Sequence, residues 1–547
     1  MSTCTRLLAL GVIAAAVAFS PTLARAASGD EKPADKSAEK PAEKSAQDVT
    51  TQGSLDAGSV HIQYTAIAGT ITVGATEEQD AQLGPDGKPL PDTDLAAAVT
   101  AAKDASQAPP LARMFYVAYF KRDAAADERP ITFLYNGGPG SSTVWLHMGS
   151  FGPKHVVTDT DTHTAAAPYK LVDNANSLLD ASDLVFIDMP GTGFGRLTGK
   201  DSAKAFWGID EDGHAFGRFI ARFLSKYNRW NSPKYIFGES YGTTRSAVLS
   251  NILENEKSID LNGVILLSQI FDFSVDIDGA HMNPGIDLAY ELALPTYAAT
   301  ARYHHKLPQD HPDLQSFLKE VEEFAMGEYS QALAKGTDLS AAEKQSIAAK
   351  LHEYTGLPVD YLMKGDLRIS GGQFEKSLQD DSGDTTGRLD TRFTGPSIDP
   401  LSEEAEYDPQ SSAISSAYVS LFNQYVRQTL KYGEGQTYLP EAQFGSAQWD
   451  FNRQGSPLMN VSNDIAIAMK TNPKLKVLVN GGYYDLATPF FAAQYEDKHL
   501  PIPEKLAGNI EYSWYESGHM VYVKSESLKQ LHDRVAAFIT SNAAGNQ

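Results

Sequence analysis

The sequence predicts an α/β fold in which helices cover a mostly parallel sheet. Short apolar runs typical of buried strands recur along the chain, and segments with helical periodicity separate them. The strand candidates are residues 114–120, 131–135, 184–187, 235–237, 264–267 and 475–479. Several of these runs end at glycine-rich turns, and open parallel sheets place functional residues at the carboxyl ends of their strands.

The turn after residues 235–237 is the most informative stretch of the chain. It reads Gly238-Glu-Ser240-Tyr-Gly242, and a helix-like run follows over 243–253. A strand, a tight Gly-x-Ser-x-Gly turn and a helix together are the context of a nucleophile elbow, whereas the pentapeptide alone also occurs in inert turns. Ser240 is therefore the candidate nucleophile, with its hydroxyl at the tip of the turn beside the first amides of a helix.

The region from about 275 to 455 has a different character from the strand-rich regions on either side. Helical periodicity and a Ser340–Glu343 capping box predict helices over 314–324, 340–351 and 413–430. Because this block interrupts the alternation of strands and helices, we expect a helical cap inserted into the core at 275–455. Its length also permits an independent second domain.

The core is then expected in two parts, 53–274 before the cap and 456–547 after it. Alternating residues over 60–73 predict an N-terminal β-hairpin with its turn near Ala68-Gly69. A final helix is predicted over 528–539, where apolar residues recur on one face of a 3.6-residue period.

The first 52 residues carry two features outside the fold. Residues 1–26 combine Arg6, an apolar stretch and a small-x-small cleavage pattern at Ala24-Arg-Ala26, which predicts a signal peptide rather than an N-terminal anchor. Residues 27–52 contain a near-repeat of eight residues with a proline in each unit and few large apolar groups. That composition predicts a disordered linker.

The composition indicates the cellular compartment and excludes some classes of binding partner. The only cysteine of the 547 residues is Cys4, which lies inside the predicted signal peptide. The exported chain would then contain no disulfide, and this favours a periplasmic or secreted protein of a bacterial envelope. The formal charge of −23 argues against nucleic acid and anionic membrane as partners. No stable membrane insertion is expected after signal cleavage.

A serine nucleophile needs a base and an acid that orients the base. His519, in a Gly518-His-Met520 loop before the last helix, is the candidate base. Asp485 follows the strand candidate 475–479 and is the candidate acid. Either residue alone is more often inert. The chain order of serine, aspartate and histidine is that of the α/β-hydrolase fold, which favours a catalytic triad of Ser240, Asp485 and His519.

Four motifs together resemble the serine carboxypeptidase family. They are Asn136-Gly-Gly-Pro-Gly-Ser-Ser142, Asp188-Met-Pro-Gly-Thr-Gly-Phe194, Gly238-Glu-Ser-Tyr-Gly242 and Gly518-His-Met520. The resemblance covers about residues 110–525, most of the chain after the predicted signal peptide. The run from Pro284 to Tyr297 resembles the bacterial branch of that family. The resemblance implies an α/β-hydrolase fold and a serine-type carboxypeptidase that removes the C-terminal residue of peptides through an acyl-enzyme.

The resemblance also implies roles for further residues. The backbone amides of Gly138 and Tyr241 would form the oxyanion hole. Asn136, Gly137 and Glu239 would bind the terminal carboxylate of the substrate, and Met520 would line the pocket for the leaving residue. Because two carboxylates in contact must share a proton, Glu239 in this role predicts activity favoured at acidic pH.

The chain departs from the family pattern at several positions. Ser141 stands where the family usually has cysteine, Tyr135 where it usually has tryptophan, and Thr243-Thr-Arg-Ser follows the elbow in place of the usual residues. These changes leave the candidate triad intact and affect the expected shape of the cap and the substrate pocket.

Two other functions remain open at this stage. An esterase or acyltransferase would use the same triad, and a non-catalytic binding protein could keep the scaffold. No cofactor or metal is expected, because the Asp276-Ile-Asp278-Gly279 turn lacks the glutamate that an EF-hand calcium loop requires.

Overall fold

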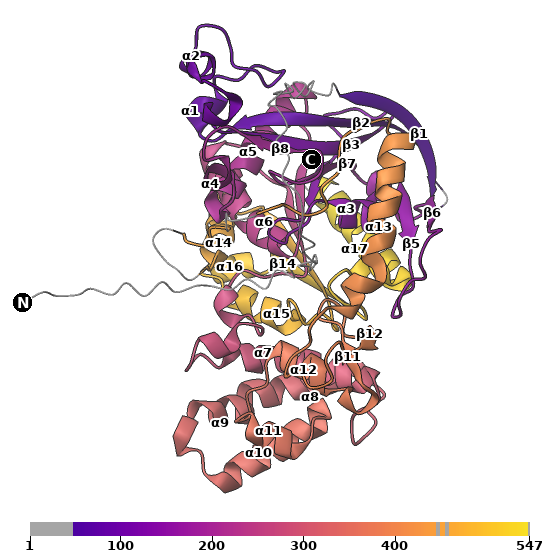
Figure 1. Cartoon of the computed structure of the whole chain (residues 1–547), viewed down its shortest axis with the longest axis vertical. Helices are drawn as coiled ribbons and strands as arrows, with labels where there is room; N and C mark the ends of the chain where they lie inside the picture. Colours follow the sequence, from indigo (N-terminus) through magenta and orange to yellow (C-terminus); the bar gives the residue numbers. More distant parts are fainter. Residues whose placement is uncertain (1–47, 59, 445–448, 454–458, 545–547) are drawn as a thin grey trace, which may run out of the picture. The chain divides into compact units, whose positions relative to one another are not determined.

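The computed structural model describes residues 48–58, 60–444, 449–453 and 459–544 (Figure 1). The predicted signal peptide and residues 27–47 of the predicted linker lie outside the described residues. Val49 already begins a strand, so the prediction that the linker continues to residue 52 is wrong for its last four residues.

A ten-stranded sheet forms the centre of the structure, in the order β1-β2-β3-β7-β4-β9-β10-β13-β14 with β8 paired to β3. All pairs from β7 to β14 are parallel, and the pairs among β1, β2, β3 and β7 are antiparallel, which confirms the mostly parallel sheet. The strands are β1 (Val49–Ala57), β2 (Val60–Gly74), β3 (Leu111–Lys121), β4 (Ile131–Tyr135), β7 (Asp183–Ile187), β8 (Arg196–Thr198), β9 (Lys234–Glu239), β10 (Gly263–Leu267), β13 (Lys476–Gly482) and β14 (Ile510–Tyr515).

The predicted N-terminal hairpin exists, but its position in the sequence is wrong. Residues 60–73 form one continuous strand, β2, which pairs with β1 on one side and β3 on the other. The chain turns at Gly58, whose φ is +58°, and not at Ala68-Gly69. Gly69 instead lies within the strand and leaves room for the Asp48 side chain, because a Cβ at this position would lie 2.1 Å from the Asp48 carboxylate. The alternating pattern therefore belonged to a single long strand.

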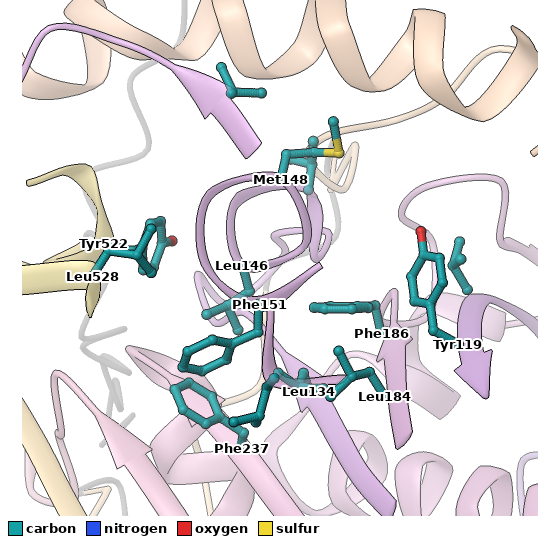
Figure 2. Close-up of a cluster of buried hydrophobic side chains, with 14 of the residues drawn as sticks. Tyr119, Leu134, Leu146, Met148, Phe151, Leu184, Phe186, Phe237, Tyr522 and Leu528 are labelled. Atoms are coloured by element: carbon teal, nitrogen blue, oxygen red, sulfur yellow. The ribbon is translucent and has the colours of Figure 1, made fainter. Parts of the chain in front are cut away.

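Helices cover both faces of the sheet, and successive strand residues pack against opposite layers. On one face, Phe237 joins a buried cluster with α13 (Pro409–Gln428) and α17 (Ser525–Ala544), part of which is shown in Figure 2. On the other, Ile236 packs with α5 (Ile209–Lys226), α6 (Tyr241–Asn251) and α14 (Ser462–Thr471). The five apolar residues that predicted the last helix all lie in the first cluster: Leu528, Leu531, Val535, Phe538 and Ile539.

The chain between β10 and β13 contains the predominantly helical block that was predicted as a cap. Its first part has a separate buried cluster that runs from Ile277 to Leu378 and also includes Leu486. The Ser340–Glu343 capping box is present. The helices of this part are α7 (Leu288–Tyr303), α8 (Leu314–Phe324), α9 (Ser330–Ala334), α10 (Ala341–Thr355), α11 (Val359–Lys364) and α12 (Gly371–Ser377). By contrast, α13 packs with the sheet.

Shorter elements complete the described fold. They are α1 (Glu77–Asp80), α2 (Asp94–Ala101), α3 (Val144–Leu146), α4 (Ser202–Phe206), α15 (Phe490–Lys498), α16 (Glu504–Ala507) and the strand pairs β5 (Lys154–Val157) with β6 (Lys170–Asp173) and β11 (Asp384–Thr386) with β12 (Thr394–Pro396). Within the described ranges, none of the helices has the length and apolar character needed to span a membrane.

Asp497 on α15 allows a test of how buried carboxyl groups affect stability. Its Oδ1 accepts a hydrogen bond from Gln269 Nε2 at 3.1 Å, and burial raises the pKa of Asp497 to about 7. A carboxyl group whose pKa is higher in the folded than in the unfolded state stabilises the fold at low pH, and this contribution is lost as pH rises from about 4 to about 7. We expect Asp497→Asn to be more stable than the parent at pH 8, by ~2 kcal/mol, and to show a smaller difference at pH 5.

Urea unfolding at the two pH values measures this effect. The exposed Asp127→Asn is the matched control and should follow the parent at both. An equal loss of stability with pH in Asp497→Asn and the parent would contradict the prediction.

Candidate active site

Ser240 lies between the end of β9 at Glu239 and the start of α6 at Tyr241. Its backbone has φ 62° and ψ −133°, a strained conformation for a residue with a side chain. The flanking glycines are required by close packing: a Cβ on Gly238 would lie 2.1 Å from the carbonyl oxygen of Gly242, and one on Gly242 would lie 2.9 Å from that of Tyr135. The turn therefore has the geometry of a nucleophile elbow.

The structure brings Asp485 and His519 together from the loops that follow β13 and β14. His519 Nδ1 lies 2.8 Å from Asp485 Oδ2, and both side chains are buried. Burial lowers the pKa of His519, but the charge and hydrogen bond of Asp485 outweigh it, so the pKa lies above its ordinary value. The hydroxyl of Thr488 donates to the same Asp485 oxygen at 2.7 Å. This arrangement fixes the imidazole and favours its protonated form.

Backbone contacts connect the elbow to the histidine loop. The amide of Ser240 donates to the carbonyl of Leu267 at 3.0 Å, and the next residue, Ser268, donates its hydroxyl to the carbonyl of His519 at 2.8 Å. The negative charge of Glu239 also contributes to the raised pKa of His519. Ser240, Asp485 and His519 thus all lie beyond the carboxyl ends of parallel strands, β9, β13 and β14, with β10 between β9 and β13.

The glycine loop after β4 lies directly against the elbow. A Cβ on Gly137 would lie 2.4 Å from the amide nitrogen of Tyr241 and 2.7 Å from that of Gly242, so only glycine permits this approach. Gly138 follows with φ +110°, in a conformation that favours glycine. The two residues predicted to supply oxyanion-hole amides, Gly138 and Tyr241, therefore belong to two loops in contact.

Glu239 and Asn136, both predicted to bind the substrate carboxylate, are hydrogen-bonded to each other. Asn136 Nδ2 donates to Glu239 Oε2 at 2.9 Å, and Glu239 is only 2% exposed. Burial raises the pKa of Glu239 to about 7, while the charge of His519 and hydrogen bonds from Tyr522 and Asn136 act in the opposite direction. The Glu239 carboxyl therefore holds a proton at acidic pH and releases it near neutrality.

Sequence reasoning missed the part that Tyr522 has in this group. Its hydroxyl donates to both Glu239 oxygens, at 3.1 and 2.9 Å, and the side chain is fully buried. Tyr522 stands only three residues after His519, but nothing in the sequence indicates that its hydroxyl reaches a residue almost 300 positions earlier. Met520, the predicted pocket residue, is 6% exposed and lies beside Gln410, with 3.4 Å between its sulfur and Gln410 Nε2.

A second missed feature is the segment 388–391, which holds both loops of the candidate triad. The carbonyl of Arg388 accepts from the amide of Leu486 at 3.1 Å, and the carbonyl of Leu389 accepts from the amide of His519 at 2.6 Å. Asp390 Oδ2 accepts from the amide of Gly518 at 3.1 Å. One segment from the insertion thus positions the aspartate and the histidine together.

A third missed feature is Arg245 on α6, one of the positions where the chain departs from the family pattern. Its side chain is fully buried in an ion pair with Asp212, with 2.6 Å between Nε and Oδ2. Its Nη1 also donates to the carbonyl of Asn136 at 2.7 Å. This arginine joins the elbow helix to the glycine loop, so both loops of the predicted oxyanion hole are anchored to the same buried side chain.

No group of three or more His, Cys, Asp or Glu side chains suited to a metal ion occurs among the residues that the structure describes.

The parallel sheet, the strained serine at the elbow and the buried aspartate–histidine pair define a protein of the α/β-hydrolase class. The sequence profile of the serine carboxypeptidase family matches residues 106–531. The chain therefore belongs to the serine carboxypeptidase family.

Individual relatives are similar over shorter stretches. The pheromone-processing carboxypeptidase KEX1 of Yarrowia lipolytica is 27% identical over 142 residues, covering 25% of this chain and 21% of the relative. The serine carboxypeptidase ctsa-3.2 of Caenorhabditis elegans is 27% identical over 146 residues, covering 26% of each. The chain therefore spans only about a quarter of the length of the curated relatives it matches.

The solved structure of KEX1ΔP, a prohormone-processing carboxypeptidase from Saccharomyces cerevisiae, is similar over a larger part of the chain. The similarity has a TM-score of 0.51 at 14% identity and covers 87% of this chain and 91% of that one. It confirms the predicted α/β-hydrolase fold.

A substitution at Gly518 tests whether the segment 388–391 positions the loop of His519. A Cβ on Gly518 would lie 2.4 Å from the Asp390 Cβ and 2.5 Å from the carbonyl oxygen of Leu389, so Gly518→Ala must move the histidine loop. A shift of about 1 Å at a catalytic group costs on the order of 100-fold in rate, and we expect a loss of that size in kcat/KM.

The matched control is Gly508→Ala, because nothing lies within 4 Å of a Cβ at that position. Steady-state kinetics on a peptide with a free C-terminus measures both variants. Full activity in Gly518→Ala would show that the close contact does not position His519.

Proposed function

We propose that this protein is a serine-type carboxypeptidase that hydrolyses the C-terminal peptide bond of peptides. The observation that carries the proposal is Glu239, a buried carboxyl group that holds a proton at acidic pH, one residue before Ser240. With Asn136 it forms a site for a terminal carboxylate beside the candidate nucleophile. An esterase or acyltransferase has no terminal carboxylate to recognise, so this group favours the peptidase.

In the proposed reaction, Ser240 Oγ attacks the carbonyl carbon of the last peptide bond while its proton passes to His519. Asp485 holds the imidazole and stabilises its protonated form. The amides of Gly138 and Tyr241 donate hydrogen bonds to the oxygen that gains negative charge. His519 then gives the proton to the departing amine, the C–N bond breaks, and the acyl group remains on Ser240.

A water molecule completes the cycle. His519 takes a proton from this water as the oxygen attacks the acyl carbon, and the ester bond to Ser240 then breaks. The proton returns to Ser240 Oγ, and the shortened peptide leaves with a new terminal carboxylate. Asn136, Gly137 and Glu239 hold the carboxylate of the residue that is removed, and Met520 contacts its side chain.

We further propose a bacterial envelope protein with a helical cap over the site. The absence of cysteine after Cys4 and the run 284–297 support a bacterial periplasmic or secreted location, although the relatives described above are eukaryotic. Peptides are the substrates that the family membership favours. The separate buried cluster from Ile277 to Leu378 supports assigning the first part of the insertion as the cap.

Ser240→Ala tests the activity itself. We expect the parent to shorten the peptides of a library from their C-termini, one residue at a time, in a mass-spectrometric ladder assay. Loss of the nucleophile should lower kcat/KM by at least about 10⁴-fold. Removal of residues from the N-terminus, or no difference between Ser240→Ala and the parent, would refute the proposal.

Glu239→Gln tests the role of the carboxyl group. As pH rises through about 7, the Glu239 of the parent loses its proton and repels the substrate carboxylate, so KM should rise ~10-fold per pH unit above that value. The glutamine variant has no group to titrate, and its KM should stay nearly constant over the same range.

An N-blocked amino-acid alkyl ester, which lacks a terminal carboxylate, serves as the control substrate. Its KM should be insensitive to the pH change in both proteins. The same alkaline rise of KM for peptides in Glu239→Gln and the parent would exclude Glu239 as the carboxylate-binding group.

A further inference from the structure

The helix α13 places two side chains with unsatisfied polar atoms next to the candidate active site. Gln410 and Tyr418 are both 0% exposed. Neither the Tyr418 hydroxyl nor Gln410 Oε1 has a hydrogen-bond partner among the described residues. A buried polar atom without a partner costs on the order of 1–3 kcal/mol, and native structures contain few of them.

Tyr418 lies beside Tyr522, which is hydrogen-bonded to Glu239. A Cβ on Gly149 would be 2.5 Å from the Tyr418 hydroxyl and 2.6 Å from the ring of Tyr522, so the two tyrosines meet at this glycine. Tyr522 in turn donates to both oxygens of Glu239. On its other side, Tyr418 packs on the half-buried ring of Trp145, with 5.6 Å between the ring centroids.

Gln410 lies against Met520. Among the described residues, its Nε2 has only the Met520 thioether as a partner, at 3.4 Å, and sulfur is a weak acceptor. Exchanging the oxygen and nitrogen of the amide would leave the same deficit, because one of the two atoms would still face sulfur and the other would still face no partner. The Gln410 amide therefore keeps unused hydrogen-bonding capacity beside Met520.

A third buried polar residue of the same helix, by contrast, has hydrogen-bond partners. Tyr425 is also buried, but its hydroxyl pairs with that of Tyr119 at 3.0 Å, and Tyr119 pairs with His147 Nε2 at 2.7 Å. The buried side-chain atoms of α13 that lack a partner, Gln410 Oε1 and the Tyr418 hydroxyl, therefore belong to the residues near Met520 and Tyr522.

We propose that Gln410 and Tyr418 form a polar wall of the pocket for the leaving residue and select C-terminal residues whose side chains carry a hydrogen-bond donor. This inference rests on the proposed carboxypeptidase function. The Gln410 carbonyl accepts from the substrate side chain, and the Tyr418 hydroxyl accepts or donates as required. A purely apolar leaving residue would keep both atoms buried and unpaired, so the same wall discriminates against it.

Matched peptides that differ only in the last residue test this preference. The pairs are Gln against Met and Asn against Leu, which are similar in size and differ in their hydrogen-bonding groups. The parent should favour the polar member of each pair by at least about tenfold in kcat/KM. Tyr418→Phe and Gln410→Met should each reduce that ratio about tenfold, mainly by slowing cleavage of the polar peptide.

Tyr425→Phe is the matched control, because it removes a buried hydroxyl from the same helix away from the site, and it should keep the ratio of the parent. A parent that favours the apolar members, or variants that keep the ratio of the parent, would overturn the inference while leaving the carboxypeptidase function intact. If the parent releases no C-terminal residue from any peptide although a fluorophosphonate labels Ser240, the proposed function fails and the inference fails with it.

Discussion

The contact between the glycine loop and the elbow is the constraint on which the rest of the site depends. Gly137 approaches the amides of Tyr241 and Gly242 so closely that no side chain fits between them. This approach is possible only because β4 and β9 are parallel neighbours whose carboxyl ends lie side by side. Arg245, which is in a buried ion pair with Asp212, then joins the helix after the elbow to the glycine loop through its hydrogen bond to the carbonyl of Asn136. Loops, strands and ion pair are thus joined by direct contacts around Ser240.

Buried carboxyl groups with raised pKa values are a second feature of the structure. Glu239 and Asp497 lie in places where ionisation is unfavourable, and burial raises the pKa of each to about 7. Of the two, only Glu239 lies next to the elbow. In the role proposed for Glu239, sharing its proton with the substrate carboxylate would offset the cost of burying it.

Local patterns explain which parts of the fold were predictable from sequence. The apolar runs of β4, β7 and β10, the last helix and the Gly-x-Ser-x-Gly elbow are encoded by neighbouring residues, and the structure contains each of them. The N-terminal hairpin was misplaced because alternation does not reveal where one long strand ends. The remaining features depend on contacts between residues more than 90 positions apart, which no local pattern reveals. These are the contacts of the segment 388–391, of Tyr522 and of α13.

The segment 388–391 also has a consequence for how the insertion relates to the core. It belongs to the inserted chain, yet its backbone binds the loops of Asp485 and His519 directly. The insertion is therefore not an interchangeable module on a self-sufficient scaffold. A chimera that replaces this insertion with that of another family member must retain these four residues, or the histidine loop loses these hydrogen bonds.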